Sequence, residues 1–256
     1  MPNLVREKDV KTFSMGCFAL TLVSFAMEFF SFPLLAKIIS SLACLALLGF
    51  YSILIKEFKS AFINIVMASL ICNLLGEISL MWDKSLEKYT NAYWAFLILH
   101  FVRDLLLVVG YYWNVIKSEI YNNILVKLAP YGIGAATVYL MQYWRDIDEK
   151  YYGIFLAFNI ISGLMLTAAC LRPNHTSDES LHWGIGASAL FILSDFLAMR
   201  TVGNFGLALR TVMLILGSYG TTMATFDHAT HYKIEVKTRV YHQFSDNLGT
   251  KLEPIV

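Results

Sequence analysis

Charged residues are scarce in this chain. Asp, Glu, Lys and Arg make up 15% of the sequence, whereas hydrophobic residues make up 57%. A soluble domain has about 25% charged and 45–50% apolar residues. The net charge is only +1, so nothing in the totals indicates a nucleic-acid partner. The scarcity of charge therefore excludes an ordinary soluble domain and predicts a polytopic membrane protein.

Motifs for metal and nucleotide binding are also absent. No Cys or His residues have metal-site spacing, and there is no Walker loop and no GxGxxG. All the cysteines lie inside apolar runs, where we interpret them as buried small side chains and not as disulfides: Cys17, Cys44, Cys72 and Cys170. The sequence therefore predicts no metal site and no cofactor.

Long apolar runs dominate what is present. A helix needs about 20 apolar residues to cross a bilayer. Eight runs qualify, at roughly Phe13–Phe30, Phe32–Tyr51, Ala61–Met81, Ala92–Tyr112, Ile124–Tyr143, Tyr151–Leu171, Leu181–Met199 and Asn204–Met223. Their short connections predict one all-α bundle of eight transmembrane helices at residues 1–226, followed by a polar tail at residues 227–256.

The loops predict an orientation. Most Lys and Arg residues of the predicted loops and tails fall on the side of both termini, and this side is normally cytosolic. We therefore expect both termini and the polar tail to be cytosolic. We expect an endomembrane location (the endoplasmic reticulum) in a eukaryote, or the inner membrane in a bacterium.

Two carboxylates lie inside predicted membrane spans, where a charged side chain has a high energetic cost. Glu77 and Asp195 sit inside the third and seventh apolar runs, and acids within a membrane usually have a partner or a function. At a rise of 1.5 Å per residue, a set of polar residues from different spans lies roughly 6–12 Å from the outer ends of those spans. The set is Lys37, Glu77, His100, Asn159, Asp195 and Arg210. The sequence therefore predicts a polar layer around a cavity in the outer half of the membrane.

Helical spacing predicts that this layer faces the interior. Ser69, Asn73 and Glu77 are four residues apart and share a face, and His100 shares one with Arg103 and Asp104. Polar faces of membrane helices normally pack against other helices.

Structural interpretations of the same residues remain open. Glu28 and Lys37 would only bridge the first hairpin near the headgroups. Arg103 and Asp104 are adjacent, so they would point in different directions and pair with neighbouring helices. His100 and Asn159 would be packing residues.

Several of these residues suggest a family. The short-looped spans, Gly76-Glu77 in the third span and Ala189-Leu190-Phe191 with Ser194-Asp195 in the seventh resemble the transmembrane lysoplasmalogenase, or YhhN-like, family. That family typically has Gly-Asp in the third span, so Glu77 is a departure that keeps the charge. It also tends to carry a His in the fourth span and a Tyr in the eighth, which His100 and Tyr219 match.

The resemblance implies a membrane hydrolase of lysoplasmalogens. Such an enzyme cleaves the vinyl ether bond of lysoplasmenyl-ethanolamine or -choline to a fatty aldehyde and a glycerophospho-headgroup. Protonating the alkene carbon opens a vinyl ether, and two carboxylates in different protonation states suit this step. We predict catalytic roles for Asp195, Glu77 and His100, and substrate binding by Lys37, Arg210, Asn73 and Tyr219.

The predicted partners are the lysophospholipid substrate and membrane lipid, with homodimer formation left open. An alternative function is a proton-coupled membrane carrier of a small anionic or lipid solute, because paired acids with Lys and Arg at one depth suit that role too. No repeat between the two halves of the sequence supports the carrier.

Overall fold

The protein is helical throughout the ranges that its structure, a computed structural model, describes: residues 7–58, 60–81, 90–115, 151–172, 176–199 and 204–248. The helices are α1 (Glu7–Phe29), α2 (Pro33–Leu54), α3 (Ala61–Met81), α4 (Asn91–Val115), α6 (Tyr152–Cys170), α7 (Asp178–Met199) and α8 (Asn204–Leu248). Within those ranges, seven helices are long and apolar enough to cross a membrane. This finding confirms a helical, multi-pass membrane protein. The fifth predicted span, Ile124–Tyr143, lies outside the described residues.

Helix starts follow from short polar residues in front of the apolar runs. Ser60, Thr90 and Ser177 immediately precede α3, α4 and α7. Each side-chain oxygen accepts the backbone N–H three residues further along, at 3.1–3.2 Å. These bonds satisfy N–H groups that have no partner inside the helix.

A tight hairpin joins α1 to α2, as the sequence predicts. Ser31 adopts a positive φ of 65°, which reverses the chain. Pro33 follows at the first position of α2, where a missing N–H costs nothing.

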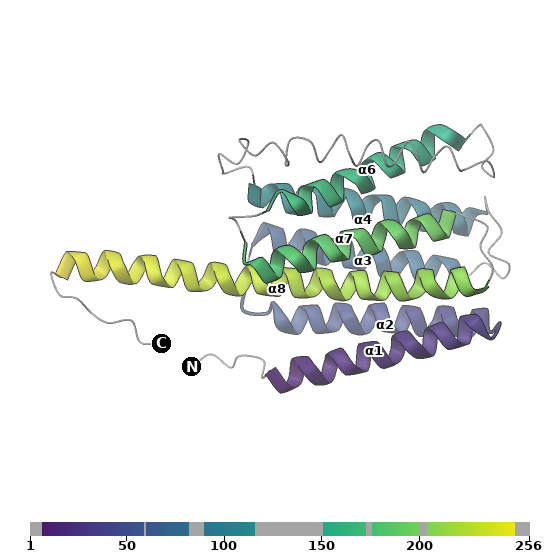
Figure 1. Cartoon of the computed structure of the whole chain (residues 1–256), viewed down its shortest axis with the longest axis horizontal. Helices are drawn as coiled ribbons and strands as arrows, with labels where there is room; N and C mark the ends of the chain where they lie inside the picture. The colour runs from purple at the N-terminus through teal and green to yellow at the C-terminus, as the bar shows by residue number, and fades with distance from the viewer. Residues whose placement is uncertain are drawn as a thin grey trace.

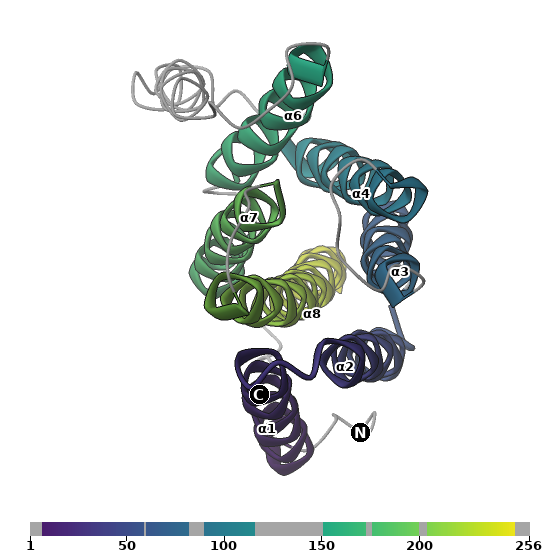
Figure 2. The ribbon, with the colours of Figure 1, turned by 90° about the vertical axis from the view of Figure 1, so that its right-hand side faces the viewer.

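The helices form a bundle with α8 beside several of the others (Figures 1 and 2). α8 contacts α7, α1, α2 and α3, while α4 contacts α3 and α6. α4 and α6 are parallel, because Trp94 packs on Tyr151 near their starts and Asp104 meets Ser162 further along. The start of α1 and the far end of α8 lie at the same end of the molecule (Figure 1). Which end faces the cytosol stays a prediction.

α8 is longer than the predicted eighth span. It runs for 45 residues and projects beyond the other helices (Figure 1). Residues 227–248, which belong to the predicted polar tail, therefore continue the same helix.

Glycines let α7 and α8 approach closely. A Cβ on Gly217 would lie 2.9 Å from the Phe191 ring, and one on Gly220 would lie 3.2 Å from the Ala187 Cβ. Small residues at such contacts are typical of membrane helix pairs. Because the two helices are antiparallel, this contact brings the end of α7 to the start of α8. Asp195 and Arg210 therefore lie at the same end of the bundle.

Polar and apolar side chains are distributed as a membrane requires. Large apolar side chains are exposed on the outer faces of the helices, for example Phe18, Leu45, Ile98 and Leu193. Buried side chains include many polar and charged ones. The four cysteines are free thiols; Cys17 and Cys44 are buried as predicted, whereas Cys72 and Cys170 are only half-buried.

Candidate functional site

Most of the buried charged residues gather into one group with several polar neighbours, here called the polar cluster. It lies at the end of the bundle where α1 joins α2. Each of its residues is at most 6% exposed. The residues are Glu28, Lys37, Ser40, Asn73, Glu77, His100, Arg103, Asp104, Ser162, Asp195 and Arg210. These residues are thus interior, as predicted, and Glu77 and Asp195 are both among them, while the cavity and its place in the outer half of the membrane stay predictions.

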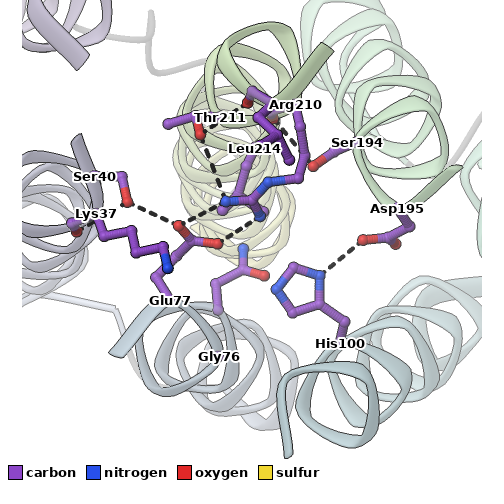
Figure 3. A network of polar contacts seen from close by, with 12 residues as sticks. Lys37, Ser40, Gly76, Glu77, His100, Ser194, Asp195, Arg210, Thr211 and Leu214 are labelled. Atoms are coloured by element: carbon purple, nitrogen blue, oxygen red, sulfur yellow. Dashed lines mark hydrogen bonds and ion pairs between the residues drawn. The ribbon is translucent and has the colours of Figure 1, made fainter. Parts of the chain in front are cut away.

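Glu77 on α3 is paired with Arg210 on α8. Arg210 Nη1 donates to Glu77 Oε1 at 2.8 Å, and Nη2 donates to Oε2 at 3.2 Å. Ser40 on α2 donates a third hydrogen bond to Oε2 at 2.7 Å (Figure 3). Bidentate, charge-assisted bonds of this kind are strong and directional. Glu77 is therefore held as a carboxylate that joins three helices.

Lys37 and Glu28 belong to the same cluster. The Lys37 side chain extends toward Glu77 (Figure 3). Glu28, which is 6% exposed, interacts electrostatically with Arg210, Glu77 and Lys37. This arrangement favours a role in the interior of the bundle over a bridge that only spans the first hairpin near the headgroups.

Asp195 on α7 holds the imidazole of His100 on α4. His100 Nδ1 lies 2.7 Å from Asp195 Oδ1 (Figure 3). Arg103 donates from Nη2 to the other oxygen, Asp195 Oδ2. Arg103 Nη1 also lies 3.0 Å from His100 Nδ1.

The position of one proton decides how these three groups interact. When Asp195 is ionised, His100 Nδ1–H donates to Oδ1 and neutral His100 has a lone pair on Nε2. When Asp195 is protonated, Nδ1 accepts a hydrogen bond and Nε2 carries the proton. His100 and Asp195 together can therefore give or take a proton at Nε2.

Among the described residues, that nitrogen has no partner. His100 Nε2 is buried without a hydrogen-bond partner. The ring lies against Gly76, where a Cβ would be 2.9 Å from Cδ2 and 3.0 Å from Nε2. Because Gly76 has no side chain, it leaves room for the His100 imidazole. The next residue, Glu77, carries a carboxylate that interacts electrostatically with this imidazole.

Replacing Gly76 with alanine should disturb this contact. The added Cβ forces the His100 ring away from α3, and overpacking of this kind costs about 1–3 kcal/mol of the free energy of unfolding. Thermal unfolding in detergent measures the effect. Gly49→Ala is the matched control, because a Cβ there meets no atom within 4 Å. Equal midpoints for the two variants would contradict the close approach.

Arg103 and Asp104 form the centre of the network on α4. Arg103 donates to Asp104 Oδ1 from Nε at 2.8 Å and from Nη2 at 2.5 Å. Asp104 Oδ2 accepts from Ser162 on α6 at 2.5 Å. The expectation that the adjacent pair points in different directions is wrong, because the long Arg103 side chain folds back onto its neighbour. The expected pairing with other helices is confirmed.

The charges of the polar cluster do not balance. It contains three cations and four carboxylates, with His100 as the only other titratable group named in it: Lys37, Arg103 and Arg210 against Glu28, Glu77, Asp104 and Asp195. Net charge is expensive in a buried site. One additional proton makes the cluster neutral. The composition of the cluster therefore favours a protonated acid beside ionised carboxylates.

Two residues that the sequence places near the site lie apart from it. Asn159 is half-buried and donates to the Phe155 carbonyl of its own helix at 2.7 Å, so its expected place in the layer is wrong. Tyr219 is nine residues beyond Arg210, about 13 Å along α8. Its hydroxyl lies 2.6 Å from that of Ser14 on α1.

Asn73 links Arg103 of the polar cluster to α8. Its Oδ1 accepts from Arg103 at 3.1 Å, and its Nδ2 donates to Ser218 on α8 at 2.9 Å. The hydroxyls of Ser40 and Ser162 are members of the polar cluster that were not predicted from the sequence. Helical spacing offers a signal for Ser40, which follows Lys37 by three residues on the same face of α2.

Comparison of the chain with family models, with curated proteins and with solved structures finds no match. The resemblance to the lysoplasmalogenase family stays a prediction. Among the described side chains, no group of three or more His, Cys, Asp or Glu residues is placed to hold a metal ion. The fold and site define a helical, multi-pass membrane protein with a buried ionic cluster around a His–Asp pair.

Proposed function

We propose that the protein is a membrane-embedded hydrolase that cleaves the vinyl ether bond of lysoplasmalogens. The observation that carries this proposal is the His100–Asp195 pair, whose Nε2 has no hydrogen-bond partner among the described residues and whose imidazole interacts electrostatically with Glu77. Acid–base catalysis requires a titratable side chain that a second group orients and that keeps one atom free to exchange a proton with the substrate. His100, oriented by Asp195, has such an atom in Nε2. The family resemblance supplies the substrate class.

His100 supplies the proton in the first step. Protonated at Nε2 and held by Asp195, it transfers the proton to the alkene carbon that does not bear oxygen. The electron pair of the double bond forms the new C–H bond, and the neighbouring carbon becomes part of an oxocarbenium ion. Glu77 stabilises this positive charge, as a carboxylate does in glycoside hydrolysis.

Water completes the reaction. It attacks the oxocarbenium carbon and gives a proton back to His100 Nε2. This addition of water forms a hemiacetal. The hemiacetal hydroxyl then loses its proton and its oxygen becomes the aldehyde carbonyl as the bond from that carbon to the glycerol oxygen breaks, and the glycerol oxygen takes up a proton. The products are a fatty aldehyde and the glycerophospho-headgroup, and the enzyme recovers its initial proton.

Lys37 and Arg210 hold the phosphate in this proposal. Both are buried at the same end of the bundle as the His–Asp pair. A single-chain lipid would keep its tail in hydrocarbon while its ether bond reaches the level of the acids. Because the side chains of the polar cluster are at most 6% exposed, entry requires neighbouring helices to separate.

Deuterium labelling tests the reaction. Purified protein in detergent, given lysoplasmenyl-ethanolamine in D₂O, should release an aldehyde with one deuteron on the carbon next to the carbonyl. Mass spectrometry measures both release and label. Incubating unlabelled aldehyde with the same protein controls for exchange after release.

The saturated ether analogue of the substrate is the matched control. It binds through the same headgroup and chain but has no alkene to protonate, so it should release nothing. Aldehyde release equal to that of protein-free detergent would refute the hydrolase. Proton-dependent solute uptake by reconstituted vesicles, with no aldehyde, would support the carrier in its place.

A further inference from the structure

A second buried arginine site lies far from the polar cluster. Arg172 follows the end of α6, and its side chain is fully buried. It contacts Ser180 at the start of α7, whereas the polar cluster contains Asp195 near the end of the same helix. The fifteen residues between them correspond to about 22 Å. The two sites are therefore at opposite ends of the bundle.

Three helices and the segment before α7 enclose the Arg172 guanidinium. Nη2 donates to Ser180 Oγ at 2.7 Å and to Thr176 Oγ1 at 3.2 Å. Ser180 in turn donates to the Ala224 carbonyl of α8 at 2.6 Å, which fixes its hydroxyl. The guanidinium carbon lies 4.8 Å from the centre of the Tyr111 ring on α4. The side chain is thus held in one position.

Its charge, however, has no counterpart in the part of the chain that the structure describes. Nε and Nη1 of Arg172 are buried without a hydrogen-bond partner, and no carboxylate of a described residue pairs with this guanidinium. Burial lowers the pKa of Arg172, and only the interaction with Tyr111 opposes that effect. Arg103 and Arg210, by contrast, are each bonded to carboxylates. An uncompensated buried cation is costly, so its retention indicates an anion that the protein binds.

We propose that Arg172 is the centre of a binding site for a phosphate group. The guanidinium offers N–H groups on Nε and Nη1 in the planar geometry that suits phosphate oxygens. Ser180 and Thr176 accept from Nη2 and so hold the other edge of the guanidinium in place. Thr176 and His228 are half-buried and lie 3.3 Å apart, so they form the side of the site nearest the surface. The proposal is independent of the proposed hydrolase.

The position of Arg172 suits a phosphate at the membrane boundary. It lies two residues beyond the last residue of the apolar α6 span, which ends at Cys170. Headgroup phosphates lie at that level, and basic pockets between membrane helices bind them. Free phosphate has the same chemistry and reaches the same level from water.

Gly184 provides a sharp test of the site. A Cβ there would lie 2.6 Å from Arg172 Nη1, so Gly184→Ala displaces the guanidinium. Gly186→Ala on the same helix is the matched control, because its Cβ would meet no atom within 4 Å. Arg172→Gln removes the charge without adding volume.

The experiment measures thermal unfolding of the full chain in a phosphate-free detergent. Inorganic phosphate is titrated in one arm and dioctanoyl phosphatidic acid in the other, with sodium chloride at equal ionic strength as control. Ligand that binds only the folded state should raise the midpoint of the wild type and of Gly186→Ala by about 3 °C or more. The shift should vanish in Arg172→Gln and fall at least threefold in Gly184→Ala.

The two arms separate the sources of phosphate. If both ligands raise the unfolding midpoint, free phosphate is sufficient to occupy the site. If only the lipid raises it, the site binds a lipid headgroup. Absence of any shift in the wild type would overturn the proposal. A shift that persists undiminished in Arg172→Gln would overturn it as well, even if Gly184→Ala failed to fold.

Discussion

Replacing Arg103 with methionine should lower the free energy of unfolding by about 3–5 kcal/mol. Arg103 is fully buried and donates to Asp104 and Asp195, and it also packs over the Phe191 ring at 4.3 Å. Methionine fills much of the same space but leaves two buried carboxylates without their cation. Removing one partner of a buried ion pair is costly because the other charge stays in place. Denaturant or thermal unfolding in detergent measures the loss.

A double variant separates charge from packing. Arg103→Met with Asp104→Asn restores the original balance of cations and carboxylates in the polar cluster. We expect it to recover about 1–3 kcal/mol of the loss, which is the coupling energy of residues in one network. If the double variant is no more stable than Arg103→Met alone, the loss of stability comes from packing and not from the carboxylates left without their cation.

Replacing His100 with glutamine should lower kcat/KM for aldehyde release by about 10²–10⁴-fold. Glutamine is polar and fits beside Asp195, but it has no group that exchanges a proton at the position of Nε2. Asp195→Asn should produce a loss of similar size, because asparagine no longer fixes the proton on His100. Initial rates with lysoplasmenyl-ethanolamine measure both variants.

His182→Gln is the control for the His100 variant. His182 is exposed on α7, and its ring bonds only to the Asp178 carbonyl of its own helix. It should keep the wild-type rate. A His100→Gln protein that unfolds at the wild-type temperature and stays within tenfold of the wild-type rate would remove His100 from the mechanism.

The polar cluster also explains why the same residues suit two different functions. Glu77 with Arg210, and Asp195 with Arg103, are separate ion pairs, and His100 interacts electrostatically with Glu77 and Arg210 as well as bonding to Asp195. A hydrolase uses the proton held near His100 on a bound alkene, whereas a carrier would move that proton with its solute. Aldehyde release distinguishes the two, because only the hydrolase breaks a covalent bond.

Sequence alone determined the axial position of the site. Apolar runs locate the helices, and a constant rise per residue converts sequence number into depth. Glu77, His100, Asp195, Lys37 and Arg210 therefore fall at one level before any packing is known. Ser31 and Pro33 likewise mark the first hairpin from local chemistry alone.

Only the tertiary structure decided which residues at that level meet. Asn159 and Ser162 are three residues apart on α6, yet only Ser162 faces the polar cluster. Depth does not say how each helix is rotated or which helix lies beside it, and these depend on contacts such as Gly217 against Phe191. Two acids at one depth therefore did not reveal that each is held by its own arginine.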